Sequence, residues 1–263
     1  MPSIRTSVFR ARFGKRPARR DPRNLAFAEL VRRAPELPET YDFDDGRTRL
    51  PTPMYANDEH GDCVIAGRAH HTLRFEYLEQ HKLLAIRDTD VLREWRRENG
   101  GTEDGLVVLD SLKAWRSAGW RVGRATYRIS AFAEVARDRP LELKRAIVMQ
   151  VGVGIGLTLP YDAVPAFEAG RPWDVSHGPG GEPDPFAGHY VYCPAYTREG
   201  PICVTWGRRQ PMTWAFLERY CDEAYVMIDA RNDAARARNG GGGPDRGELD
   251  RERLRERLED ATR

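Results

Sequence analysis

Membrane segments, dense cysteines and a dominant charge are all missing from this 263-residue chain. No stretch approaches the roughly 18 uninterrupted apolar residues that a transmembrane helix needs, so we expect no membrane span. The first twenty residues are basic but contain no apolar core, which argues against a secretory signal peptide. Four cysteines are too few for a disulfide scaffold, so we expect reduced thiols and a cytoplasmic protein.

The charges of the chain almost cancel. Forty-two Lys and Arg residues stand against 40 Asp and Glu residues, which gives a formal net charge of +2. Charge over the whole chain therefore does not indicate a nucleic-acid-binding protein. What the sequence does have is 40% hydrophobic residues and six tryptophans, which predicts a folded body with a sizeable core.

Composition divides the chain into three zones. Residues 1–50 are a basic N-terminal arm and an extended leader, 51–229 are the folded body, and 230–263 are a flexible Gly-rich linker with a charged C-terminal helix. Residues 1–24 hold eight basic side chains against one acid, which predicts an arm that is mobile when free and docks on an acidic surface or nucleic acid. The candidate polyanion-binding residues are Arg10, Arg12, Lys15, Arg16, Arg19 and Arg20. Whether residues 1–50 cover the body as an inhibitory leader or hang free stays open.

Hydrophobic periodicity predicts helices first and strands later in the body. The expected helices cover residues 25–34, 63–82, 88–98, 106–117, 141–150 and 213–223. The expected strands cover residues 151–159, 189–196, 201–207 and 224–228, with mixed structure over 120–135. This order predicts an α+β fold with a helical half and an antiparallel sheet half.

One cysteine lies where a helix is expected to begin. Cys63 follows Gly61 and Asp62, and the unpaired amides and dipole of a helix N-terminus favour a reactive thiolate. Asn57, six residues upstream, has an amide that is able to donate to an oxyanion. His189 is a candidate general base at the start of a later strand, so nucleophile and base would meet between the two halves.

These segments together resemble the papain-like cysteine peptidases over roughly residues 50–229. The resemblance rests on Asn57 to Cys63 and the helix after them, on Gly188-His189-Tyr190-Val191, and on Thr205-Trp206-Gly207. It implies Cys63 as nucleophile, His189 as general base and Asn57, in place of the Gln of the family, as oxyanion donor. It also implies a papain-like fold with the site between the two halves, a peptide or amide substrate, and neither cofactor nor metal.

One position departs from the pattern of the family. The family places an Asn beside its Ser-Trp-Gly to orient the histidine, and the alignment puts Val204 there. Thr205 is the nearby polar side chain that is able to replace it if the strand register allows. Trp206 would shield the histidine. The NDxxGDC, GHYV and VTWGxxQPMT motifs also resemble uncharacterised papain-like proteins of bacteriophages, which implies the host cytoplasm or a virion.

Alternative interpretations of the same residues remain. A zinc site from His60, Cys63, Cys193, Cys203 and His189 has poor ligand spacing. Asp222 and Glu223 are expected at the end of a helix, where adjacent side chains diverge, so no shared acid site is expected there. The function is therefore either a cysteine hydrolase or a catalytically inactive papain-like, phage- or virion-associated interaction protein.

Overall fold

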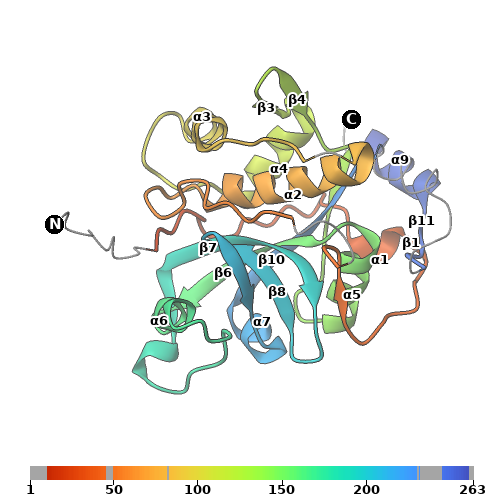
Figure 1. Ribbon diagram of the computed structural model, residues 1–263. Helices are drawn as coiled ribbons and strands as arrows, with labels where there is room; N and C mark the ends of the chain where they lie inside the picture. Colours follow the sequence, from red (N-terminus) through yellow and green to blue (C-terminus); the bar gives the residue numbers. More distant parts are fainter. Residues whose placement is uncertain (1–10, 46–49, 82, 230, 232–244, 261–263) are drawn as a thin grey trace.

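Two halves, one mainly helical and one a sheet, face each other in the computed structural model (Figure 1). The structure describes residues 11–45, 50–81, 83–229, 231 and 245–260. Within these ranges no helix is long and apolar enough to cross a membrane. The expected α+β class, with helices and an antiparallel sheet, is confirmed.

The helical half is built on one long buried helix. It comprises α2 (Cys63–Gln80), α3 (Asp88–Glu98), α4 (Val108–Ser117) and the hairpin of β3 (Trp120–Val122) and β4 (Ala125–Tyr127). The first fourteen residues of α2 are all buried because the helix lies between the sheet and the other helices. The expected helix over 88–98 is found with the same ends.

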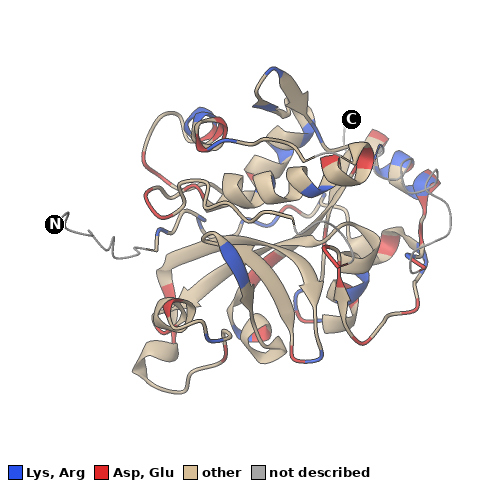
Figure 2. Ribbon diagram, viewed as in Figure 1, with Lys and Arg blue, Asp and Glu red and all other residues tan. Residues whose placement is uncertain are grey.

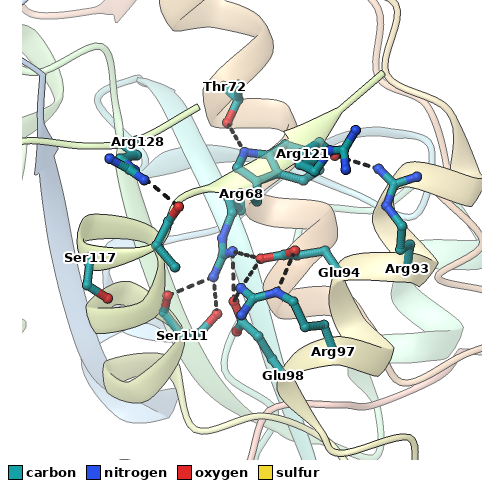
Figure 3. Close-up of polar contacts among 12 residues, drawn as sticks. Arg68, Thr72, Arg93, Glu94, Arg97, Glu98, Ser111, Ser117, Arg121 and Arg128 are labelled. Atoms are coloured by element: carbon teal, nitrogen blue, oxygen red, sulfur yellow. Dashed lines mark hydrogen bonds and ion pairs between the residues drawn. The ribbon is translucent and has the colours of Figure 1, made fainter. Parts of the chain in front are cut away.

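A buried ion-pair network joins the three helices of this half (Figure 3). The Arg68 guanidinium lies 3.0 Å from a Glu94 oxygen and 2.8 Å from a Glu98 oxygen, and it also donates to the Ser111 carbonyl at 2.7 Å. All three charged side chains are at most 6% exposed. A buried charge is tolerated only when it is paired and hydrogen-bonded, and this arrangement satisfies that condition for Arg68.

The other half is an antiparallel sheet of seven strands. Six follow the spatial order β5-β10-β6-β7-β8-β9, and the seventh, β2, pairs with β7. Their bounds are β5 Ala131–Glu134, β6 Val153–Pro160, β7 Pro183–Tyr196, β8 Pro201–Thr205, β9 Arg208–Pro211 and β10 Cys221–Ile228. Both β6 and the second half of β7 are buried on both faces, which explains their continuous apolar sequences.

Helices and a turn surround this sheet. Their bounds are α5 Pro140–Met149, α6 Ala163–Glu168, the 3₁₀ turn Pro179–Gly181 and α7 Trp214–Tyr220. Pro140 occupies the first turn of α5, as expected from its fixed φ and missing N–H. Thr213 caps α7, since its side chain accepts a hydrogen bond from the Phe216 amide. Acidic and basic side chains alternate over the helices and loops, while most strands carry few of either (Figure 2).

The leader and the C-terminal segment pair with each other on the body. The expected helix over 25–34 is reduced to α1 (Phe27–Leu30), and β1 (Val31–Arg33) pairs with β11 (Glu248–Leu249) ahead of α9 (Arg251–Asp260). The short β2 (Tyr41–Asp42) joins the sheet. Several residues of this leader are core residues, namely Leu25, Phe27, Leu30, Tyr41, Phe43 and Leu50. Much of the leader therefore belongs to the folded body, which the expected boundary at residue 50 left outside.

Candidate active site

Helix α2 places the Cys63 thiol at the junction of the two halves. The helix begins at Cys63, and the Asp62 carbonyl accepts hydrogen bonds from the Ile65 and Ala66 amides. One turn later Gly67 lies against the Tyr190 ring, where a Cβ would come within 2.6 Å of a ring carbon. Because residue 67 has no side chain, β7 approaches α2 closely, and the Tyr190 amide donates to the Cys63 sulfur at 3.4 Å.

His189 lies on β7, next to the residue that contacts Cys63. Its Nε2 is 2.6 Å from the Thr205 hydroxyl oxygen, so the residue expected to replace the orienting Asn does contact the ring. Its Nδ1 is buried and makes no hydrogen bond within the described part of the chain. The ring is thus held at one nitrogen and has the other nitrogen unused.

Trp206 covers the imidazole of His189. The two rings stack with centroids 4.3 Å apart and planes inclined by 22°. Trp206 and Gly207 form the two-residue loop between β8 and β9, and both have positive φ, 43° and 78°. Such a loop matches the twist of the hairpin, but a tryptophan at positive φ is strained. The strained turn therefore positions the indole over His189.

Asn57 is buried in the loop before the nucleophile, with a bonding pattern that the sequence did not predict. Its Nδ2 donates to an Asp62 carboxylate oxygen at 2.9 Å and to the His60 carbonyl at 3.2 Å. Both hydrogens of the amide are therefore used inside the loop in this arrangement. The Asn57 amide shapes the entry to α2, and it would have to release one of these bonds to serve an oxyanion.

Residues 11–16 of the arm lie across the site. The Lys15 amide donates to the Gly188 carbonyl at 3.0 Å, the Leu106 amide donates to the Gly14 carbonyl at 2.8 Å, and the Arg16 amide donates to the Leu106 carbonyl at 2.8 Å. The segment is thus bonded to both halves. A Cβ on Gly14 would lie 1.7 Å from the Gly61 carbonyl oxygen, so only glycine fits this close to the start of α2.

Both Cys63 and His189 are buried, which shifts their pKa values. Cys63 is 1% exposed and His189 is 0% exposed. Burial raises the pKa of Cys63 to about 12, with a smaller rise from Asp62, although the Tyr190 and Gly14 amides and Lys15 lower it. Burial, with a smaller contribution from Lys15, lowers the pKa of His189 to about 3. Desolvation therefore opposes the helix N-terminus and disfavours the thiolate in this covered state, and the reactive thiolate stays a prediction.

The prediction of a mobile polyanion-binding arm needs correction over its described residues. Lys15 is buried in an ion pair with Asp222 at 2.7 Å, and Arg19 pairs with Asp110. Lys15 is not available to an external polyanion, because the acids that it meets belong to the chain itself, whereas the Arg19 side chain is 54% exposed. Arg12, Arg16, Arg19 and Arg20 are exposed, so a polyanion contact through them stays a prediction. Arg10 and the glycine run 240–243 lie outside the described residues.

Sequence reasoning missed the pairing of Lys15 with Asp222 and Glu223. The two acids lie on β10, not on a helix, and the β10 register shifts between Cys221 and Glu223. A bulge of this kind lets adjacent side chains reach one partner, whereas regular strand residues point to opposite faces. Within the described ranges no three His, Cys, Asp or Glu side chains gather as a metal-binding group.

Known structures share this fold. The chain is similar to xylellain, a cysteine protease from Xylella fastidiosa, with a TM-score of 0.62 and 14% identity over 86% of this chain and 100% of that one. It is also similar to a cysteine protease of Carica candamarcensis (TM-score 0.55, 14% identity, 73% and 99% covered). Bromelain from Ananas comosus gives a TM-score of 0.52 at 13% identity, with 73% and 100% covered. The chain has a papain-like fold.

The sequence of this chain has no match of the kind that its fold has. No family model matches the chain, and no curated protein matches it. The three structural neighbours named above are 13–14% identical to this chain, so they establish the fold and leave the chemistry to be argued from the site itself.

Proposed function

We propose that this chain is a cysteine hydrolase, a peptidase or amidase, with Cys63 as nucleophile and His189 as general base. One observation supports it above all. His189 is fixed at Nε2 by Thr205 and shielded by Trp206, its Nδ1 is unused, and the amide of the next residue, Tyr190, contacts the Cys63 sulfur. A histidine held in this way is suited to take a proton from a neighbouring thiol.

The proposed reaction forms and breaks one acyl-sulfur bond. His189 Nδ1 takes the Cys63 proton, and the thiolate attacks the substrate carbonyl to give a tetrahedral intermediate. The Cys63 amide, in the first turn of α2, points out of the helix N-terminus and donates to the oxyanion. The imidazolium then protonates the leaving amine, and a thioester remains. Water activated by His189 hydrolyses the thioester and restores the thiol.

We further propose that the chain is latent while residues 11–16 lie in the cleft. Both reacting groups are buried beneath this segment, and its hydrogen bonds to Gly188 and Leu106 occupy the backbone groups that line the site. A substrate has to displace the segment, and exposure of Cys63 would then remove the desolvation that keeps its thiol protonated.

Covalent labelling tests the proposal without a known substrate. The neighbouring Carica protease binds E-64. We expect E-64 to label Cys63 slowly in the full chain, and faster in a Lys15→Glu variant in which the acids repel the arm. His189→Ala should suppress the labelling, whereas Cys203→Ala is the matched cysteine control. Hydrolysis of a casein substrate by the same variants is the second readout.

The alternative is a non-catalytic papain-like protein that uses the same body for interaction. It is favoured by Asn57, whose amide is bonded within its own loop and faces Asp62 and the His60 carbonyl. In that case neither wild type nor Lys15→Glu would react with E-64 or cleave casein. A phage- or virion-associated role remains a proposal from the sequence resemblance.

A further inference from the structure

A single arm residue is inserted deep into the cleft. The Lys15 side chain is 1% exposed, although it belongs to a segment whose neighbours Arg12 and Arg16 are exposed. Its ammonium lies 2.7 Å from Asp222 Oδ2 and 3.5 Å from Glu223 Oε1, and it donates to the Arg16 carbonyl at 3.2 Å. Asp222 and the Arg16 carbonyl thus accept hydrogen bonds from the ammonium, and Glu223 adds a second negative charge beside it.

The pocket around this side chain is shaped for a long basic residue. Gly156 of β6 lies beside the aliphatic stem, and a Cβ at this position would come within 2.9 Å of Lys15 Cδ. Thr158, two residues along the same strand, donates to Asp222 Oδ2 at 3.0 Å and fixes the carboxylate. The other oxygen, Oδ1, is buried and accepts no hydrogen bond from the described residues. The pocket therefore has spare acceptor capacity beyond what one ammonium uses.

Removal of the lysine would leave this pocket with two poorly solvated acids. With Lys15 in place, the Glu223 side chain is 4% exposed and the Asp222 side chain is 29% exposed. Burial raises the pKa of Glu223 to about 7, and Lys15 opposes the rise. An apolar side chain would bury the acids without a partner, whereas a basic one would pair with them.

The pocket lies one residue away from the catalytic junction. Gly14 lies against Gly61 just before Cys63, and the next residue, Lys15, enters the pocket while its amide bonds to Gly188, the residue before His189. A peptide that takes the place of the arm would therefore present a side chain to the pocket from a position adjacent to the residue at Cys63.

We propose that the Asp222–Glu223 pocket selects substrates with a Lys or Arg side chain adjacent to the residue attacked by Cys63, and that Lys15 imitates this side chain in the covered state. The proposal rests on the proposed function, because it concerns the substrate of the same site.

The cation preference of the pocket is measurable without any activity. A Lys15→Ala variant of the full chain lacks the side chain beyond Cβ, and n-propylammonium has the atoms needed to replace it. We expect n-propylamine at neutral pH to raise the thermal midpoint of this variant saturably, and 1-propanol, of the same size but uncharged, to leave it unchanged. Lys113→Ala is the matched control, since Lys113 is 43% exposed and pairs with Asp21 at the surface.

The same effect should disappear when the pocket loses its charge. Adding Asp222→Asn and Glu223→Gln to Lys15→Ala should remove the response to n-propylamine, while Glu134→Gln on the neighbouring strand should preserve it. Equal stabilisation by the amine and the alcohol, or a response that persists in the triple variant, would contradict the proposed cation preference of the pocket. If Lys15→Ala does not fold, Lys15→Met is the second variant, because the methionine side chain keeps the packing. The thermal midpoint of Lys15→Met should not respond to n-propylamine, because the pocket is filled.

Substrate selection is tested with matched fluorogenic peptides in the Lys15→Ala background. The peptides differ at one position, which holds Lys, Arg or norleucine, and this position is moved along the residues flanking the cleaved bond. We expect kcat/KM for the basic peptides to exceed that for norleucine by about 100-fold or more at one position, since a site built for a polar group rejects its absence. In the triple variant the ratio should fall to about 1, because the acids are then neutral. Cleavage of all peptides with equal efficiency would overturn the inference, whereas cleavage of none, together with no E-64 labelling, would overturn the proposed function.

Discussion

Thr205 and His189 lie 16 residues apart in sequence, and the Thr205 hydroxyl oxygen is 2.6 Å from Nε2 of the imidazole. The tautomer that has a bare Nδ1 carries its hydrogen on Nε2, which then donates to Thr205. Val204, the residue aligned with the orienting Asn of the papain-like peptidases, pairs with Tyr192 in the sheet. Adjacent strand residues point to opposite faces, so Thr205 rather than Val204 reaches the histidine.

Loss of the Thr205 hydroxyl should weaken hydrolysis while the site stays assembled. We expect Thr205→Val to lower kcat by about 10- to 100-fold, because His189 would lose its fixed tautomer and ring orientation. Thr205→Ser should restore most of the rate, and Cys63→Ala should abolish it. The measurement is kcat and KM on one fluorogenic peptide. An unchanged kcat in Thr205→Val would show that Cys63 and His189 act as a pair and do not need Thr205.

Alkylation should report whether the arm covers Cys63. In the full chain we expect iodoacetamide to label Cys63 slowly between pH 6 and 8, because burial raises the pKa of its thiol to about 12 and little thiolate is present. Lys15→Glu should increase the labelling rate by about 10-fold or more, since exposure removes the desolvation. Cys193, Cys203 and Cys221 are buried internal controls for general unfolding. Fast labelling of Cys63 in the wild type at pH 6 would contradict the covered state.

Asp62 should make the chain less stable as the pH rises. Burial raises the pKa of this carboxyl from 3.8 to about 8, so between about pH 4 and pH 8 the folded state holds a proton that the unfolded state releases. Stability therefore falls with rising pH across this window. Asp62→Asn should be more stable than wild type by over about 1 kcal/mol at pH 8, and by less near pH 4. Urea unfolding at the two pH values measures the difference, and Glu59→Gln is the exposed control. The same gain at both pH values would show that ionisation of Asp62 is not its cause.

Arg68 should matter more to stability than its neighbour Arg97. Arg68→Ala leaves the buried Glu94 and Glu98 with only the half-exposed Arg97 as a shared cation (Figure 3), which should cost about 3–5 kcal/mol of unfolding free energy. Arg97 contacts Glu94 at 2.6 Å but is 47% exposed, so Arg97→Ala should cost about 1 kcal/mol or less. Chemical denaturation measures the free energy of unfolding of both variants. Equal losses of stability would show that the buried ion pairs of Arg68 contribute no more than the exposed one of Arg97.

Local features of the sequence were enough to predict much of the fold. The helix that starts at Cys63 and the helix over 88–98 follow from apolar periodicity and from turn residues at their ends, which act within a few residues. Strand β1 (Val31–Arg33), which lies within the helix expected over 25–34, was missed because it forms only by pairing with β11, more than two hundred residues later. Short strands of this kind are specified by their partners rather than by their own sequence.

In the candidate site, too, some features follow from local sequence and others only from distant partners. By itself, the sequence determined the residue types and spacings of Cys63, His189 and Thr205, since these belong to one helix start and two strands. Only the tertiary structure decided that Lys15 enters a pocket formed by Asp222, 207 positions away, and that burial raises the pKa of the covered thiol. Ion pairing and desolvation depend on what the whole chain places around a group, so no local pattern contains them.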